Sequence, residues 1–115
     1  MPYQFVDRLT HVEIRLEGVV DEDLVIDAGV IERIGDVRRV LVDYSAVTGV
    51  RLDSLFLAEA ARRQEAEGVK VAVFAPTPVM FGFNRQVLQL AGVREGVTAS
   101  VFSDLADARK WLLAG

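Results

Sequence analysis

The chain has 115 residues, of which 51% are hydrophobic and 26% charged, and its formal net charge is −4. This is the composition of an ordinary globular protein, and a chain of this length buries roughly two-thirds of its unfolded surface. The basic residues are scattered among the acidic ones, which argues against nucleic-acid binding driven by counterion release. The absence of cysteine excludes disulfides, thiolate nucleophiles and cysteine-ligated metal centres, and fits a reducing compartment.

Targeting and membrane signals are also missing from the sequence. The first ten residues carry no basic region followed by an apolar run, and no apolar stretch approaches the ~18–20 residues of a membrane span. We therefore expect a cytoplasmic protein. No internal repeat or linker interrupts the chain, so we expect residues 1–115 to form one domain.

The first half of the chain predicts two strands, a helix and a third strand. Residues 3–6 can form a short strand, and residues 11–20 alternate apolar and polar side chains as a half-buried strand does. The acids at 21–23 suggest a helix start, because carboxylates favour the positive end of a helix dipole. Residues 39–44 have the pattern of a central strand, and residues 45–49 resemble a turn.

The second half predicts three helices separated by two strands. Asp53 is expected to cap a helix to about residue 67, whose alanines would permit close approach to a sheet. A strand at 69–75 precedes Thr77, an N-cap candidate with Pro78 at the first helical position, and Gly92 ends that helix. A strand at 97–102 then leads to a helix that Ser103 is expected to cap. Trp111 is expected to anchor this last helix against the rest of the fold.

The predicted element order is β-β-α-β-α-β-α-β-α. A helix that joins two strands forms a right-handed crossover between parallel neighbours, whereas two strands in direct succession can pair antiparallel. The sequence therefore predicts an α/β fold built on a mixed sheet.

A search for catalytic chemistry finds no recognisable set. His11 is the single histidine, so a metal site would need carboxylates alone, and the acids at 21–23 and Asp27 lie where helix capping is the better interpretation. The chain has no nucleophile elbow and no glycine-rich phosphate loop. We expect no enzyme activity, metal or cofactor, although two carboxylates such as Asp43 and Asp104 could meet in space.

Ligands of open α/β sheets bind beyond the carboxyl ends of the strands, where three connections are expected to converge: residues 43–53, 76–81 and 103–104. The first, residues 43–53, leads into a helix where a phosphate on serine would be stabilised by the helix dipole. Its candidate binding or phospho-acceptor residues are Tyr44, Ser45, Thr48, Asp53 and Ser54. The alternative is that the tyrosine ring packs in the core and the last serine only begins a helix.

The second connection, residues 76–81, continues into a helix with a core stripe at Met80, Phe83, Val87 and Ala91. A different face would carry an aromatic beside an arginine. The candidate ligand or partner residues here are Pro76, Pro78, Phe81, Phe83 and Arg85. Alternatively, Phe81 covers a sheet edge or a neighbouring helix.

Three stretches carry a resemblance: LVDYSAVTGVRLDSL (41–55), KVAVFAPTPVMFGFNRQVLQL (70–90) and VTASVFSDLADARKWLL (97–113). With the element order, they resemble the SpoIIAA-like branch of the STAS domains over nearly the whole chain. The resemblance implies helices mainly on one side of the sheet and a non-enzymatic role in regulated protein binding, with a protein partner or self-association, including a homodimer.

The same resemblance bears on the phospho-acceptor and on an alternative function. The anti-sigma factor antagonists of this branch carry their phospho-acceptor in an Asp-Ser-[Ser/Thr]-Gly stretch at the start of the helix. Here residues 53–56 keep the Asp-Ser but lack the second hydroxyl and the glycine. The branch is also similar to the lipid-transfer CRAL-TRIO fold, in which a helix gates an apolar pocket. Phe81 and Phe83 would lie at that gate, so the alternative is a carrier or sensor of a small apolar ligand or lipid.

Overall fold

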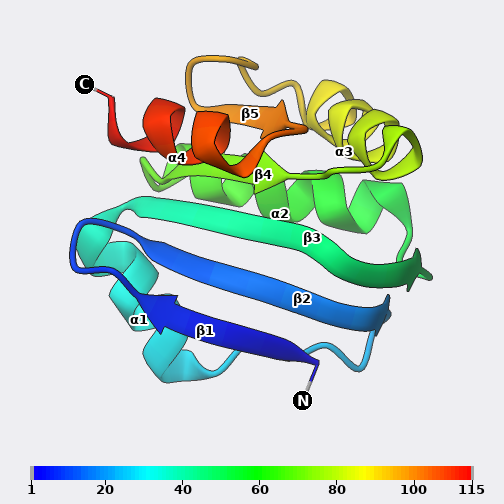
Figure 1. Ribbon diagram of the computed structural model, residues 1–115, viewed down its shortest axis with the longest axis horizontal. Coiled ribbons are helices and arrows are strands. Elements are labelled where there is room, and N and C mark those ends of the chain that lie inside the picture. The colour runs from blue at the N-terminus through cyan, green and yellow to red at the C-terminus, as the bar shows by residue number, and fades with distance from the viewer. Residues whose placement is uncertain (1, 115) are drawn as a thin grey trace.

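The computed structural model describes residues 2–114, which form one five-stranded sheet with four helices (Figure 1). The strands β1 (Tyr3–Asp7), β2 (Val12–Val20), β3 (Arg39–Val50), β4 (Lys70–Phe74) and β5 (Ala99–Phe102) lie side by side in chain order. β1 and β2 pair antiparallel as a hairpin, and each later neighbour pairs parallel. The predicted α/β class, mixed sheet and element order are confirmed.

Strand β3 is longer than the sequence suggested. Residues 45–49, interpreted as a turn, are strand, because β2 offers a backbone partner up to its last residue. The pairing reaches Val20 and Val50 after two register shifts, and the backbone N–H of Arg51 still donates to the Val20 carbonyl at 2.7 Å. The connection after β3 is therefore confined to residues 51–53.

The helices are α1 (Ala28–Val37), α2 (Ser54–Ala66), α3 (Pro78–Ala91) and α4 (Leu105–Leu113). Helix α1 begins after the acids at 21–23, so their predicted capping role is wrong. Helix α4 is capped by Asp104, whose carboxylate accepts from the Asp107 N–H at 2.9 Å, rather than by Ser103. Each of the helices α2 and α3 begins at its expected residue.

Three helices cover one face of the sheet and one helix covers the other. The main apolar core on the first face includes Val30 and Ile34 of α1, Leu88 of α3 and the half-buried Ala61 of α2. On the second face α4 packs over a smaller cluster made of Leu41, Ala72, Ala108 and Leu112. The expectation of helices mainly on one side is confirmed.

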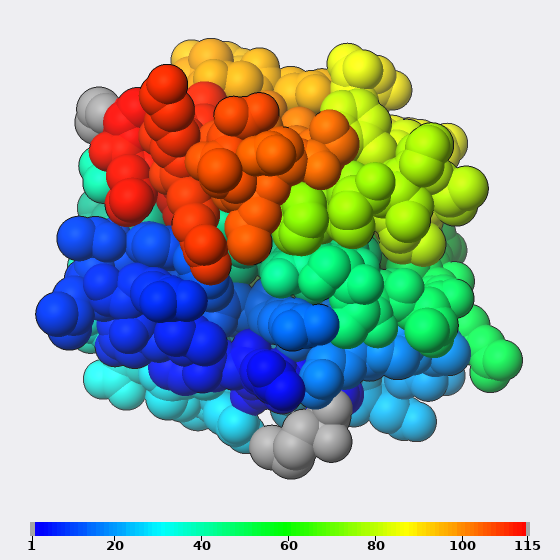
Figure 2. All heavy atoms as spheres, viewed as in Figure 1, coloured from blue at the N-terminus to red at the C-terminus, as the bar shows by residue number. Residues whose placement is uncertain are grey.

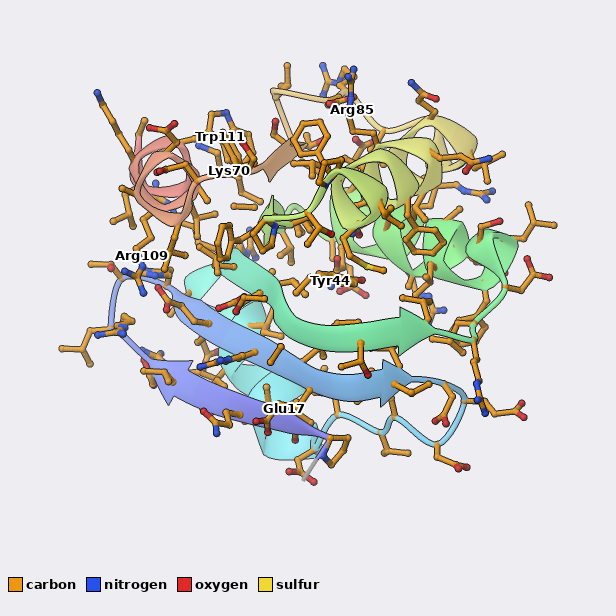
Figure 3. The ribbon with its side chains drawn as sticks, turned by 45° about the vertical axis from the view of Figure 1, so that its right-hand side comes forward. Glu17, Tyr44, Lys70, Arg85, Arg109 and Trp111 are labelled. Atoms are coloured by element: carbon orange, nitrogen blue, oxygen red, sulfur yellow. The ribbon has the colours of Figure 1, made fainter. Side chains whose placement is uncertain are left out.

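Trp111 lies on α4 close to the amino end of β4 (Figure 3). Its indole N–H donates to the Gly96 carbonyl at 3.2 Å, and the Lys70 ammonium lies 4.3 Å from its ring centroid. The ammonium also donates to the carbonyls of Trp111 and Ala114 at the end of α4. These contacts hold the last helix against the sheet, as the sequence suggested for this tryptophan.

Candidate functional site

The start of α2 lies at the carboxyl edge of the sheet, directly after β3. The Asp53 carboxylate accepts from the Leu55 N–H at 2.9 Å, which is the predicted cap and explains why the helix begins at Ser54. Leu55 and Phe56 follow in the first turn, each with 60% of its surface exposed. Two large apolar side chains therefore face solvent at this helix start.

The start of α3 is also capped by a side chain and also exposes apolar residues. The Thr77 hydroxyl accepts from the Met80 N–H at 3.3 Å, and Pro78 occupies the first turn, where its missing N–H costs no hydrogen bond. Pro76 and Pro78 are exposed, and Val79 has 75% of its surface exposed. As predicted, Thr77 caps the helix.

The two helix starts lie together because β3 and β4 are parallel neighbours and α2 packs along α3. Residues near 50–56 and 78–82 meet along the right-hand side of the molecule in the space-filling view (Figure 2). We call the exposed apolar residues of this region the carboxyl-edge face; they are Leu55, Phe56, Pro76, Pro78 and Val79. A surface of this kind can bind a protein partner.

The candidates that precede α2 are not gathered in one loop. Tyr44, Ser45 and Thr48 lie within β3, and only Asp53 and Ser54 belong to the helix start. Tyr44 is buried in the main core, where desolvation raises the pKa of its hydroxyl to about 12. Its ring therefore packs, as the alternative interpretation held, whereas the side chains of Ser45 and Thr48 are exposed and that of Ser54 is half-buried.

On α3 the predicted core stripe is buried or half-buried, and Phe81 packs as the alternative interpretation held. Phe81 packs against the main core, and Phe83 packs into the small cluster between α2 and α3. Arg85 is exposed, and its Nε donates to the Glu95 carboxylate at 3.0 Å. The predicted outer face of Phe81 and Arg85 is wrong because α3 is covered on two sides, by the sheet and by α2.

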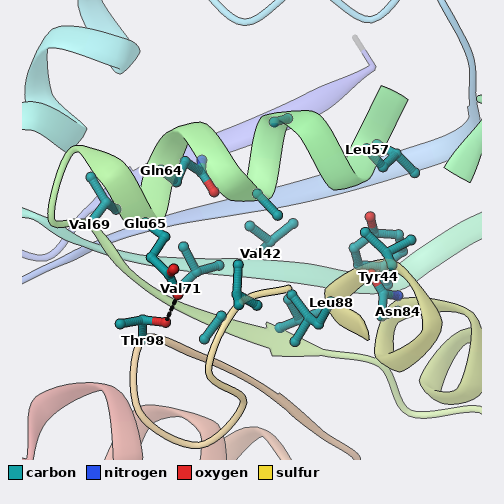
Figure 4. Close-up of a pocket in the computed structure, with 16 residues that line it drawn as sticks. Val42, Tyr44, Leu57, Gln64, Glu65, Val69, Val71, Asn84, Leu88 and Thr98 are labelled. Carbon is teal, nitrogen blue, oxygen red and sulfur yellow. Dashed lines mark hydrogen bonds between the residues drawn. The ribbon is translucent and has the colours of Figure 1, made fainter. Parts of the chain in front are cut away.

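A cavity of about 130 Å³ lies between α2, α3 and the sheet (Figure 4). Its walls are mostly apolar, with Tyr44, Gln64 and Asn84 among the polar lining residues. Ligand pockets usually measure about 300–1,000 Å³, so this volume gives no support to a lipid carrier. Of the α2 alanines that were expected to permit close approach to the sheet, Ala61 packs against the main core and Ala58 is fully buried against α3. Ala60 and Ala61 also line this cavity.

A buried ion cluster on the second face escaped the sequence interpretation. The Glu13 carboxylate accepts two hydrogen bonds from Arg109, at 2.8 and 2.9 Å, and lies 2.7 Å from Nε2 of buried His11. Burial alone would raise the pKa of Glu13, but the hydrogen bonds from Arg109 and His11 lower it to about 2. The alternating pattern of the strand had predicted that Glu13 faces water.

The carboxylates raised as possible acid-base groups have structural partners. Asp43 accepts from the Ser45 N–H at 2.7 Å, and Asp104 caps α4. Within residues 2–114 no three His, Asp or Glu side chains form a group that could hold a metal ion. None of the helices in this part of the chain is long and apolar enough to cross a membrane.

No family model and no curated protein matches the chain. Solved structures do: an uncharacterised DUF3478-family protein with a SpoIIAA-like fold from Shewanella loihica PV-4 shares 13% identity at a TM-score of 0.57, covering 96% of this chain and 91% of that one. The anti-sigma factor antagonist SpoIIAA in its unphosphorylated form shares 17% identity at a TM-score of 0.55, covering 94% of both chains. At these identities the likeness is one of architecture: the chain has a SpoIIAA-like fold.

Proposed function

We propose that this chain is a non-enzymatic, STAS-like regulatory module of the cytoplasm that binds a protein partner through its carboxyl-edge face. The fold supports a regulatory module, because one of the matching structures is an anti-sigma factor antagonist. The partner is a second protein or another copy of this chain. The small cavity and the structural roles of Asp43 and Asp104 favour neither a lipid carrier nor an enzyme.

The observation that carries the proposal is the exposure of Leu55, Phe56 and Val79 at two adjacent helix starts. Each side chain leaves more than half of its surface in water. Aromatic and aliphatic side chains that become buried at the centre of an interface supply most of its binding free energy. A partner that covers these three residues would bury apolar surface that the fold leaves exposed.

Ser54 gives this face a means of control. It is the first residue of α2, next to Leu55, and its side chain is half-buried rather than enclosed. A phosphate there would add about −1.5 to −2 charges beside the face, and the helix dipole would stabilise it. Its phosphorylation stays a prediction, because the residues after it differ from the usual acceptor motif.

The test is affinity capture from the cytosol of the source organism, followed by mass spectrometry. The wild type is compared with Phe56→Ser/Val79→Ser and with the control Leu90→Ser/Val97→Ser, which removes side chains that are 43% and 58% exposed elsewhere. We expect one protein, or a second copy of the chain, to be retained by the wild type and the control but lost from the face variant. Circular dichroism verifies that each variant is folded.

Two results would refute the proposal. One is a wild type that retains no protein above background, and the other is equal capture by the face variant and the control. The Ser54→Asp and Ser54→Ala variants form a further arm, in which the added charge weakens capture and the alanine does not. Peptide mapping of the protein from its own cells shows whether Ser54 carries phosphate.

A further inference from the structure

The connections at the carboxyl edge of the sheet are strongly acidic. They are residues 21–27, 51–53, 75–77 and 103–104, which follow β2, β3, β4 and β5. Together they carry six carboxylates, Asp21, Glu22, Asp23, Asp27, Asp53 and Asp104, against one basic residue, Arg51. The whole chain has a formal charge of only −4, so negative charge is concentrated at this edge.

Most of this charge is not neutralised within the fold. Of the five ion pairs among residues 2–114, none includes a carboxylate of these four connections. Asp27 accepts from the Tyr3 hydroxyl at 2.6 Å, and Asp21, Asp53 and Asp104 accept from backbone N–H groups close to them in the chain. Glu22 and Asp23 are exposed.

The acids at 21–23 adjoin the carboxyl-edge face. Val20 pairs with Val50 at the ends of β2 and β3, so Asp21 and Arg51 leave the sheet side by side. Asp53 lies two residues further on and directly precedes the first turn of α2, which holds Leu55 and Phe56. In the space-filling view the segments near 20–25 and 50–56 adjoin on the same side of the molecule (Figure 2). Apolar side chains and uncompensated carboxylates thus form one surface.

Resting on the proposed function, we infer that the partner of this face is a basic protein segment, with apolar side chains flanked by lysine or arginine. Charge complementarity selects it, because opposite charges around an apolar centre speed encounter and exclude partners of the wrong sign. Anionic lipid surfaces and nucleic acids carry the same sign as this edge and are repelled. The apolar residues therefore receive a protein rather than enter a membrane.

The test uses two synthetic amphipathic helical peptides of about 18 residues, or five turns, with the same leucine and alanine face. One has lysine and the other glutamate on its polar face. We expect the lysine peptide to shift the amide resonances of residues 21–23, 53–56 and 79 of the full chain, with affinity that falls as sodium chloride is raised. The glutamate peptide leaves these resonances in place.

Matched charge variants test the cause of binding. Binding of the lysine peptide should weaken about tenfold in the variant Asp21→Asn/Glu22→Gln/Asp23→Asn. The control variant is Glu32→Gln/Glu59→Gln/Glu67→Gln, which changes the net charge equally at exposed positions outside the edge. The control should leave the affinity for the lysine peptide within about twofold of the wild type. Equal binding of both peptides at the face overturns the inference but leaves the proposed function standing. No binding of either peptide, or adsorption of the face to phosphatidylglycerol vesicles, also overturns it, while the capture experiment decides the proposed function separately.

Discussion

At the scale of single residues, Glu13 is the carboxylate on which the second face of the sheet depends. It is only 8% exposed and holds Arg109 and His11 together. Glu13→Gln keeps the shape of the side chain but leaves the guanidinium without its charged acceptor. We expect the free energy of unfolding at pH 7 to fall by about 2 kcal/mol, measured by urea denaturation.

The same residue predicts a pH dependence. Its folded-state pKa of about 2 lies below the ordinary value of 4.5, so its contribution is fully present above pH 4.5 and is lost as pH falls from 4.5 toward 2. The stability gap between the wild type and Glu13→Gln should therefore narrow between pH 5 and pH 3. Glu17→Gln, on the same strand but outside the ion pairs of residues 2–114, should cost under about 0.5 kcal/mol. A gap that stays constant over this range would contradict the assignment.

Which residues of β2 face the main core could be predicted from alternation alone, and Val12, Ile14 and Leu16 are all buried there. The burial of Glu13 could not, because its partner Arg109 lies 96 residues away and reaches it only through the docking of α4. For the candidate site, local signals placed the cap at Asp53. They left Tyr44 at the boundary between the predicted strand and the connection after it, and the continuation of β3 to Val50 places this residue within the strand, with its ring buried.

At the scale of elements, helix α3 offers two glycines with opposite roles. Gly92 ends the helix in the left-handed region at φ 69°, which L side chains rarely adopt, whereas Gly82 lies within the helix with open space around an added Cβ. Gly92→Ala should lower the free energy of unfolding by about 1 kcal/mol. Gly82→Ala should raise it by about 0.5–1 kcal/mol. Urea denaturation of both variants tests the signs, and two shifts in the same direction would refute the argument.

Element boundaries were predictable where one residue type dictates the backbone. Thr77 with Pro78 and the terminal Gly92 bound α3 as expected, because capping and left-handed geometry act within a few residues. The end of β3 and the start of α1 could not be predicted in this way, because they depend on partners that are distant in the chain. Pairing with β2 carries β3 to Val50, and Tyr3 binds Asp27 at the residue before α1.

At the scale of the whole molecule, α2 is the least firmly seated of the long helices. It buries only Ala58, whereas α3 buries four residues. A cavity of about 130 Å³ lies between this helix, α3 and the sheet, and a groove of about 280 Å³ lies between it and α1. Hydrogen exchange measured by NMR should therefore show lower protection for the amides of α2 than for those of α3, by about tenfold or more.

If the cavity beside α2 causes the lower protection of its amides, filling the cavity should bring the protection of α2 closer to that of α3. Ala61→Leu adds apolar volume to the wall of the cavity, while Ala66→Leu adds the same group at an exposed position of the same helix. The first variant should raise the protection of α2 and the free energy of unfolding by about 1 kcal/mol, and the second should change the stability by under about 0.5 kcal/mol. Because α2 also carries Leu55 and Phe56 of the carboxyl-edge face, a partner that binds this face would contact a mobile helix. Equal protection of α2 and α3 in the wild type, or no response to Ala61→Leu, would show that the cavity does not loosen this helix.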